Sequence, residues 1–526
     1  MNNYLKIPFR VNGLSVEYVA GVFVAILILL QLWNLTFGSL TTLGAYGNFG
    51  DEAVMTQASL RILGGQIPHL DFYSYAPGTA YLPLTAWMFF FGQDYVSIQS
   101  FNFLCALFLI VSVFWLGAIF SRRIGILSGL LFAFIVFPLW PIVSYHWQFL
   151  ILAILSTRLL MGKLNDFRIM TSGLCLVLAG LLLPNKAMFL AISLLATIII
   201  FSPRGARLKR VFLFMSAPMF VLISILLALL FSGLIEPVWT QLIYNNLTFY
   251  PTFAGGNTTD GILFVLFSLI FFTPLFTSQS VRSEWKKPYI IMAMANTSLM
   301  LSLFYFPETI HLAQVSAFTL VLILVALTTL WHASSFSIGK IGSPLKVATL
   351  SFTIIVVALV GYWWLGRLIS VQFKTRYYRP SENQSSIITP RGSVLINNRW
   401  YPSIDNDKSF SLARQLPVMD KVLRTELANQ RVFFFPFSPG YYYFYKKNNP
   451  TSYDLLPSSS PPYADEEKLK SELLLNADTL VYIKSEWVGF KEDSELMNWM
   501  YSTFPQKTLL LNGEIMILSK KQIIKI

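Results

Sequence analysis

The sequence predicts a polytopic α-helical membrane protein that carries a smaller α/β domain toward its C-terminal end. Of the 526 residues, 55% are hydrophobic and only 12% are charged, and the mean hydropathy is +0.58. Soluble domains have roughly twice that share of charged residues, so the composition excludes an ordinary soluble protein. Apolar runs of about 20 residues, each long enough to cross a bilayer, recur up to residue 370, after which the chain becomes polar.

The apolar runs predict eleven membrane helices. The first run follows Lys6 and Arg10 and has no small-residue cleavage site, so we interpret it as a membrane helix and not as a signal peptide. Residues 80–91 are apolar but short, which predicts a re-entrant or interfacial helix. The eleven predicted spans are 18–37, 101–120, 124–140, 147–161, 169–183, 187–202, 211–233, 261–279, 289–305, 312–331 and 347–368.

The distribution of charge predicts the orientation in the membrane. With a cytoplasmic N-terminus, every Lys and Arg of residues 1–370 falls on the inner side except Arg61, Lys186 and Arg367, a strong positive-inside bias. Basic inner loops thus explain the net charge of +13, and we expect no nucleic-acid partner. The two cysteines lie in apolar runs and predict no disulfide framework and no zinc site. The outer loops are acidic and carry Asp51, Glu52, Asp71, Asp94, Glu236, Asp260 and Glu308.

The polar tail is predicted to be an outer α/β domain, because an odd number of spans places it opposite the N-terminus. We divide the chain into a membrane domain, 1–370, and a tail domain, 371–526, with a linker at 377–404. Asp465 is a candidate N-cap, and Asn512-Gly513 is a hairpin turn signal. The predicted strands are 433–435, 479–483 and 515–518, and the predicted helices are 465–476 and 493–504.

The first outer loop, residues 38–100, carries the motif that points to a function. It contains Gly47-Asn48-Phe49-Gly50-Asp51-Glu52, then 65–68, and then the run from His69 to Gly78. This loop resembles the first outer loop of the GT-C membrane glycosyltransferases, the class that includes protein O-mannosyltransferases and the aminoarabinose transferase of lipid A (glycosyltransferase family 39-like). The resemblance implies that Asp51 is the catalytic base and that Glu52 assists by positioning the acceptor or a metal. The alternative for Asp51 is the N-cap of a helix over 52–63.

The same resemblance implies a donor in which the sugar is carried on a polyprenyl phosphate, whose phosphate is the leaving group. Cations at the outer face are scarce, so Lys186, Arg61 and His311 are the candidates for binding that phosphate. The alternatives are snorkelling of Lys186 to the head groups and a solvated position for Arg61. The segment 308–312 resembles an acidic-x-x-His-Leu pattern of GT-C-like proteins, and its spacing places Glu308 and His311 on one helix face.

Other polar residues of the outer loops are candidates for binding the acceptor or the sugar: His69, Asp71, Tyr75, Glu308, Tyr244 and Asn245. An interfacial aromatic belt is the alternative for the aromatic residues of loop 236–260. His69, His146 and His311 with the outer carboxylates could also bind a divalent metal ion. No ligand motif such as H-E-x-x-H is present, so we assign no metal residues and no definite cofactor.

The sequence therefore predicts a GT-C-type glycosyltransferase of the cytoplasmic (inner) membrane that acts on the extracytoplasmic side. It would move a sugar from a polyprenyl-phosphate donor to a glycan, lipid or protein of the cell envelope, and its partners would be that donor and membrane lipids. No Trp-Trp-Asp motif of oligosaccharyltransferases is found. Two alternatives remain: a lipid or polysaccharide transporter, and a non-catalytic membrane anchor that presents the tail as a binding module. The sequence does not indicate the oligomeric state.

Overall fold

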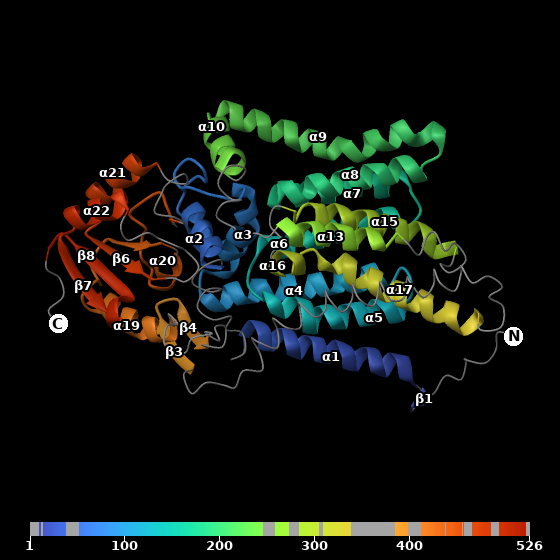
Figure 1. The fold of residues 1–526 in the computed structure, drawn as a ribbon, viewed down its shortest axis with the longest axis horizontal. Helices are drawn as coiled ribbons and strands as arrows, with labels where there is room; N and C mark the ends of the chain where they lie inside the picture. The colour runs from blue at the N-terminus through green and yellow to red at the C-terminus, as the bar shows by residue number, and fades with distance from the viewer. Residues whose placement is uncertain are drawn as a thin grey trace.

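The computed structural model shows a bundle of apolar helices with a sheet-containing C-terminal part at one end (Figure 1). Two short helices lie between these parts. The structure describes residues 10–11, 14–37, 52–245, 258–272, 283–304, 309–337, 384–397, 412–436, 438–454, 456, 465–484 and 494–521.

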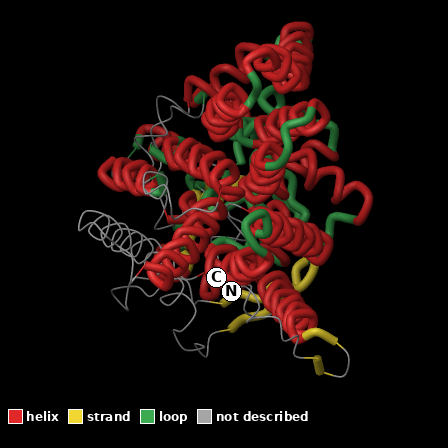
Figure 2. Tube along the Cα trace, turned by 90° about the vertical axis from the view of Figure 1, so that its right-hand side faces the viewer, coloured by secondary structure: helices red, strands yellow, loops and turns green. Residues whose placement is uncertain are grey.

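Long helices that run side by side form the bundle (Figures 1 and 2). Within it α6 packs against α7, α4 and α15, and α9 lies on the outside against α7 and α8. The helices are α1 (Val16–Phe37), α4 (Tyr95–Gly117), α5 (Arg122–Leu131), α6 (Tyr145–Met161), α7 (Asp166–Leu182), α8 (Pro184–Phe201), α9 (Arg207–Phe231), α13 (Thr258–Ile270), α15 (Ser283–Leu301) and α17 (Ser316–Ser337).

The ends of these helices follow from local sequence signals. The side chains of Ser121, Ser144 and Asn165 accept a backbone N–H at the starts of α5, α6 and α7. Pro184 occupies the first turn of α8, where its missing N–H costs nothing. The helix begun by α5 continues as a π-turn, η3 (Phe132–Val136), and a 3₁₀ turn, η4 (Phe137–Leu139), as expected where Pro138 removes a backbone donor.

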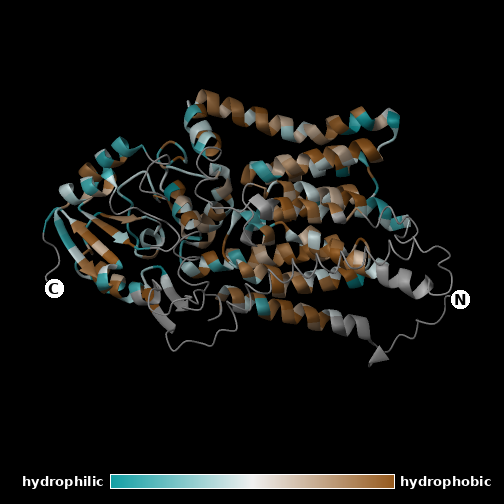
Figure 3. Ribbon diagram, viewed as in Figure 1, coloured by the Kyte–Doolittle hydropathy of each residue, from teal (hydrophilic) through white to brown (hydrophobic). Residues whose placement is uncertain are grey.

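The helices predicted from the sequence match this bundle, apart from the one at 347–368, which lies outside the described residues. Four helical segments of the described chain are long and apolar enough to cross a membrane: Tyr95–Gly117, Arg122–Leu139, Pro184–Phe201 and Arg204–Phe231. Shorter apolar helices cover Gly21–Phe37 and Ser316–Thr329. Figure 3 shows that apolar residues cover these helices. The protein is thus a membrane protein, although the described residues do not establish eleven spans.

Small residues allow α4 and α5 to pack closely. Such close contacts between small residues are typical of helices in a membrane, where the hydrophobic effect does not drive helix association. A Cβ on Gly125 would lie 2.8 Å from the backbone oxygen of Phe114, and one on Gly117 would lie 2.8 Å from Oγ of Ser128. Glycine at both positions therefore permits a backbone approach that alanine would prevent.

The first outer loop contributes α2 (Glu52–Leu63), a 3₁₀ turn η2 (Gly78–Tyr81) and α3 (Leu82–Phe91). The helix predicted over 52–63 is confirmed, and α3 has the short length predicted for 80–91. Hydroxyl Oγ1 of Thr79 donates to the backbone oxygen of Leu181, which fixes this loop to the end of α7. The loop thus covers the end of the bundle at which α8 begins.

The C-terminal part is built on a four-stranded sheet with the strand order β5-β6-β8-β7. β5 (Val432–Phe435) pairs parallel to β6 (Thr479–Ile483), and β8 (Ile515–Ser519) pairs antiparallel to both β6 and β7 (Gln506–Leu510). The three predicted strands are confirmed, and β7 was missed because its alternation of exposed and half-buried residues is weak. The turn at Asn512-Gly513 joins β7 and β8, with Leu511, Asn512 and Gly513 in the left-handed region.

Helices and a hairpin complete the C-terminal part: α19 (Leu412–Arg424), α20 (Gly440–Phe444), α21 (Glu466–Asn476), α22 (Glu495–Thr503) and the hairpin of β3 (Gln384–Thr389) and β4 (Gly392–Asn397). Asp465 caps α21 by accepting the N–H of Lys468 at 3.0 Å, which confirms that prediction.

The loops between the long helices contain short helices: α10 (Ile235–Val238), η6 (Trp239–Tyr244) and α16 (Thr309–Ala313). A further 3₁₀ turn is η5 (Arg204–Ala206), and β1 (Arg10–Val11) pairs with β2 (Leu14–Ser15). The predicted domain boundary at 370 lies outside the described residues.

Candidate active site

Glu52, the first residue of α2, is buried at the centre of a hydrogen-bond network. Its side chain is 2% exposed. Oε1 accepts from Nε2 of Gln99 at 2.9 Å, and Oε2 accepts from the backbone N–H of Val143 at 3.2 Å. Burial raises the pKa of Glu52 to about 7, and the two hydrogen bonds only partly oppose this effect. The residue therefore joins α2 to α4 and to the segment before α6.

Asp51, the predicted base, lies outside the described residues, so its side chain is not placed. The described chain resumes at Glu52, and α2 begins there.

A second group of polar side chains gathers where α6, α8 and α16 begin. Nζ of Lys186 lies 3.2 Å from Nδ1 of His146 and donates to Oε1 of Gln314 at 3.4 Å. The rings of His146 and His311 are 5.4 Å apart, centre to centre. We call Lys186, His146, His311 and Gln314 the basic cluster.

The basic cluster holds a buried lysine that has no carboxylate partner among the described residues. Lys186 is 4% exposed, and no carboxylate of the described residues lies within ion-pair distance of it. An ammonium that donates to Nδ1 of His146 places the proton of that neutral ring on Nε2, which then is a donor. The cluster thus combines a positive charge with hydrogen-bond donors, and this chemistry matches a phosphate.

One short segment connects the two groups. Val143, whose N–H binds Glu52, is followed by Ser144, which caps α6, and His146 lies in the first turn of that helix. The first-loop motif and the basic cluster therefore belong to the same end of the helix bundle. Glu52 and Lys186 are nevertheless 134 residues apart in the sequence (186 − 52).

Arg61 does not join the basic cluster. Its Nη2 pairs with Oδ1 of Asp454 at 2.8 Å, and both side chains are almost fully buried. It also donates to the backbone oxygen of Thr451 and to Oε1 of Gln66, and it stacks over the ring of Phe72. Its guanidinium thus holds α2 against the C-terminal part, and the binding of donor phosphate by Arg61 stays a prediction.

His69 fixes two outer loops to each other. Its backbone has a φ of 70°, an uncommon conformation for a residue with a side chain. Nδ1 lies 3.0 Å from Oε1 of Gln241 in η6, and Nε2 of Gln241 donates back to the backbone oxygen of His69. Burial lowers the pKa of His69, so the neutral ring is favoured. The structure therefore shows a clamp between loops at this position.

The remaining predicted sugar-binding residues differ in their exposure, and their binding role stays a prediction. Asp71 is exposed and closes its own turn by accepting the N–H of Ile67 at 2.6 Å. Tyr75 is half-buried against the core, Tyr244 is exposed at the end of η6, and Asn245 is buried. Glu308 lies outside the described residues. The described chain contains no group of three or more His, Cys, Asp or Glu arranged to hold a metal ion.

Sequence reasoning missed the glutamines that organise these sites. Gln99 holds Glu52, Gln241 holds His69, and Gln314 contacts Lys186. His146 was predicted only as a possible ligand of a divalent metal ion, and its contact with Lys186 was not predicted. The only sequence signal for these residues was that each is a polar residue at the end of an apolar run. Such residues are too common for that signal to identify the ones that contact Glu52, His69 or Lys186.

Comparison with known proteins supports the fold. No family model and no curated protein matches the sequence. Among solved structures, ArnT from Cupriavidus metallidurans bound to undecaprenyl phosphate is similar, with a TM-score of 0.53, 10% identity, and coverage of 97% of this chain and 99% of that chain. Archaeoglobus fulgidus oligosaccharyltransferase in the apo form aligns with a TM-score of 0.44 at 11% identity over 88% of this chain and 69% of that one. The likeness to ArnT shows that this chain has the GT-C fold of membrane glycosyltransferases.

Proposed function

We propose that this protein is an integral membrane glycosyltransferase that moves one sugar from a polyprenyl-phosphate carrier to an acceptor of the cell envelope. The reaction would take place at the outer face of the cytoplasmic membrane, where the positive-inside bias puts the first loop. The observation that carries the proposal is the basic cluster: a buried cation without a carboxylate partner, joined through Val143 to the acidic motif of the first loop. The GT-C fold supports it, and so does the bound undecaprenyl phosphate in the similar ArnT structure.

In the proposed reaction the acceptor oxygen or nitrogen attacks the anomeric carbon. A new bond forms there, and the bond between that carbon and the phosphate oxygen breaks on the opposite side, which inverts the configuration. Asp51 takes the proton of the acceptor. The electron pair of the broken bond stays with the polyprenyl phosphate, so its negative charge grows during the step.

The basic cluster would stabilise that growing charge. Lys186 supplies a buried positive charge, and His146 and His311 supply ring nitrogens beside it. Such interactions gain strength where water is excluded and charge develops in the transition state. Glu52 acts by position: it fixes the start of α2 relative to Gln99 and Val143 and so holds Asp51 near the reacting groups.

The alternatives find less support among the described residues. A transporter needs polar groups along a path through the membrane, whereas the residues of the proposed reaction site, Glu52 and the basic cluster, are joined at one end of the bundle. A separate binding module on an anchor needs a tail that is independent of the bundle. Arg61 pairs with Asp454, and the N–H of Tyr73 donates to the backbone oxygen of Ser452 at 2.8 Å, so the first loop and the tail are packed together.

The experiment that tests the function is sugar transfer by the purified protein from a panel of radiolabelled polyprenyl-phosphate sugars, with and without chelator. Asp51→Asn is compared with Asp166→Asn, which breaks only an exposed ion pair with Lys209. We expect transfer by the wild type and Asp166→Asn, and a loss of about 10²–10⁴-fold in Asp51→Asn, the range for removing a general base. Full activity of a folded Asp51→Asn protein would contradict the role of Asp51. Absence of transfer from every donor would contradict the function.

A further inference from the structure

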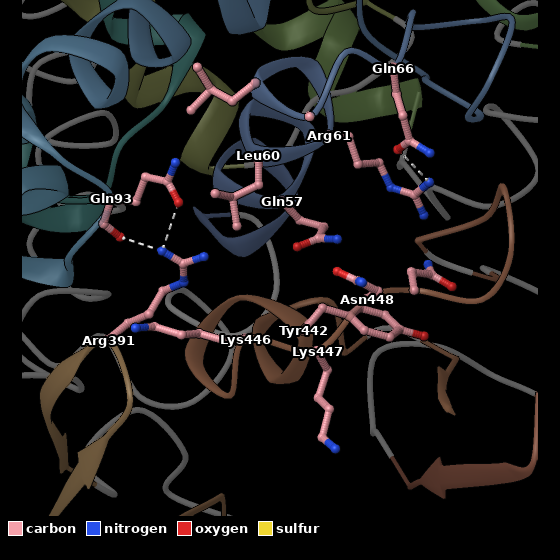
Figure 4. Close-up of a pocket in the computed structure, with 13 residues that line it drawn as sticks. Gln57, Leu60, Arg61, Gln66, Gln93, Arg391, Tyr442, Lys446, Lys447 and Asn448 are labelled. Atoms are coloured by element: carbon pink, nitrogen blue, oxygen red, sulfur yellow. Dashed lines mark hydrogen bonds between the residues drawn. The ribbon is translucent and has the colours of Figure 1, made fainter. Parts of the chain in front are cut away.

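A polar cavity lies between the first loop and the C-terminal part, on the α2 face that carries Arg61. Its volume is about 580 Å³, within the range of about 300–1,000 Å³ that is usual for small-molecule sites. Figure 4 shows its walls: α2, Gln93 between α3 and α4, the β3–β4 turn, and α20 with the chain that follows it. The lining residues are Gln57, Leu60, Arg61, Leu63, Gly64, Gln66, Gln93, Arg391, Tyr442, Lys446, Lys447, Asn448 and Asn449.

A buried amide points into this cavity. Gln57 is 5% exposed, and its Oε1 has no hydrogen-bond partner among the described residues. Figure 4 shows its amide directed to the space between Arg391 and Asn448. A buried amide oxygen without a partner is costly, so Gln57 brings to the cavity wall a hydrogen-bonding capacity that no described residue uses.

The charge of the lining is positive. It contains four cationic side chains and no carboxylate. The carboxylate of Asp454, which is not part of the lining, neutralises Arg61. Nζ of Lys447 donates to the backbone oxygens of Leu427 and Ala428. Backbone oxygens leave the charge of Lys447 in place but occupy its ammonium group, so Arg391 and Lys446 are the cationic side chains left to bind an anion in the cavity.

Arg391 and Lys446 lie on the same wall. The hydrogen bonds of Arg391 to Tyr443 and Gln93 use Nε and Nη1, and Nη2 faces the cavity in Figure 4. Lys446 is exposed, and its side chain extends toward Arg391. Its backbone φ of 52° is uncommon for a residue with a side chain, which indicates that the segment is held in place.

We propose that this cavity binds an acidic saccharide, a sugar that carries a phosphate or a carboxylate. Arg391 and Lys446 would bind the anionic group, and the amides of Gln57 and Asn448, which both donate and accept, would bind the sugar hydroxyls. That this saccharide is part of the acceptor rests on the proposed function, because α2 provides one wall of the cavity and also begins next to Asp51. Binding itself does not depend on catalysis.

The test measures binding to the purified full-length protein in detergent without any polyprenyl donor. The probes are glucose 1-phosphate, inorganic phosphate and glucose, titrated by calorimetry. The variants are Gln57→Met, which keeps the size of the side chain, and Lys446→Gln, which changes an exposed residue. Lys521→Gln is the matched control, because it removes an exposed charge of the C-terminal part outside the cavity lining. Thermal unfolding confirms that each variant is folded.

We expect glucose 1-phosphate to bind more tightly than either phosphate or glucose, and each cavity variant to weaken it about tenfold or more, the effect of losing a hydrogen bond to a charged or buried group. Lys521→Gln should bind as the wild type does. Equal binding of phosphate and glucose 1-phosphate would overturn the saccharide assignment, and unchanged binding in both folded cavity variants would overturn the site.

The same variants separate this inference from the proposed function. Asp51→Asn should keep wild-type binding of glucose 1-phosphate while losing transfer. Transfer by the wild type without binding of the probe would refute the cavity and leave the function in place. Probe binding that is lost in Gln57→Met, together with no transfer from any donor, would refute the function and leave the cavity in place.

Discussion

The carboxylate of Glu52 accepts the backbone N–H of Val143 at 3.2 Å, three residues before His146, whose ring lies 3.2 Å from the ammonium of Lys186. An acidic loop motif and a buried basic cluster thus share one short piece of backbone. A shift of α2 would be transmitted to the start of α6 and from there to the lysine. This connection makes the two halves of the proposed reaction site depend on each other.

The first prediction concerns Glu52 and pH. Burial raises the pKa of Glu52 from its ordinary value of 4.5 to about 7 in the folded protein. Between these values the folded state holds a proton that the unfolded state has released, so stability falls as pH rises from about 4.5 to about 7. The difference corresponds to about 3 kcal/mol in the free energy of unfolding. In Glu52→Gln this contribution to the pH dependence should disappear.

The measurement is thermal unfolding of the wild type and Glu52→Gln in detergent from pH 5 to pH 8. The amide of Glu52→Gln offers one acceptor oxygen to the two donors, Gln99 and the N–H of Val143. We therefore expect the free energy of unfolding to fall by about 1 kcal/mol at pH 5, and to fall less or to rise at pH 8. Parallel pH profiles of the two proteins would show that Glu52 titrates normally.

The second prediction concerns Lys186. Lys186→Met keeps the apolar stem and removes the buried charge, so binding of a polyprenyl phosphate should weaken about 10- to 100-fold, the loss expected for a hydrogen bond to a charged group. Binding is measured with undecaprenyl phosphate and purified protein in nanodiscs. Lys209→Met serves as the control, since that ammonium is exposed and pairs with Asp166. Equal affinity in the two variants would contradict a phosphate site at Lys186.

The third prediction concerns His146 and His311, whose rings are 5.4 Å apart. If both bind one phosphate together with Lys186, the effects of His146→Gln and His311→Gln on donor affinity should not add. A double-mutant cycle on undecaprenyl phosphate binding measures the coupling, and we expect about 0.5–3 kcal/mol, as for residues that share a partner. Additive effects would assign the two histidines to separate roles.

The fourth prediction concerns the ion pair of Arg61 and Asp454. Both side chains are buried, so Asp454→Asn leaves an uncompensated charge and should reduce stability by about 3–5 kcal/mol. Asp478→Asn breaks the exposed pair with Arg431 and should have a much smaller effect. Denaturant unfolding measures both. Limited proteolysis of Asp454→Asn should also release the C-terminal part more readily, and resistance equal to that of the wild type would show that other contacts suffice.

The sequence by itself determined that this is a helical membrane protein, and it determined the helix bundle, three strands of the sheet, and helix α2 in the first loop. These features follow from local patterns: apolar runs of membrane length, alternating apolar strands, and caps such as Asp465. The sequence also marked Lys186 and Arg61 as unusual, because they are two of the few cations on the predicted outer face.

Only the tertiary structure decided what those charges do. Lys186 meets His146 and Gln314, whereas Arg61, of the same charge, meets Asp454 in the C-terminal part, 393 residues away. The partner of a cation is set by which helix ends and loops pack together, and sequence spacing carries no record of that packing. The same holds for Gln57: nothing in its neighbourhood along the chain indicates that a cavity between two parts of the protein leaves its amide oxygen without a partner.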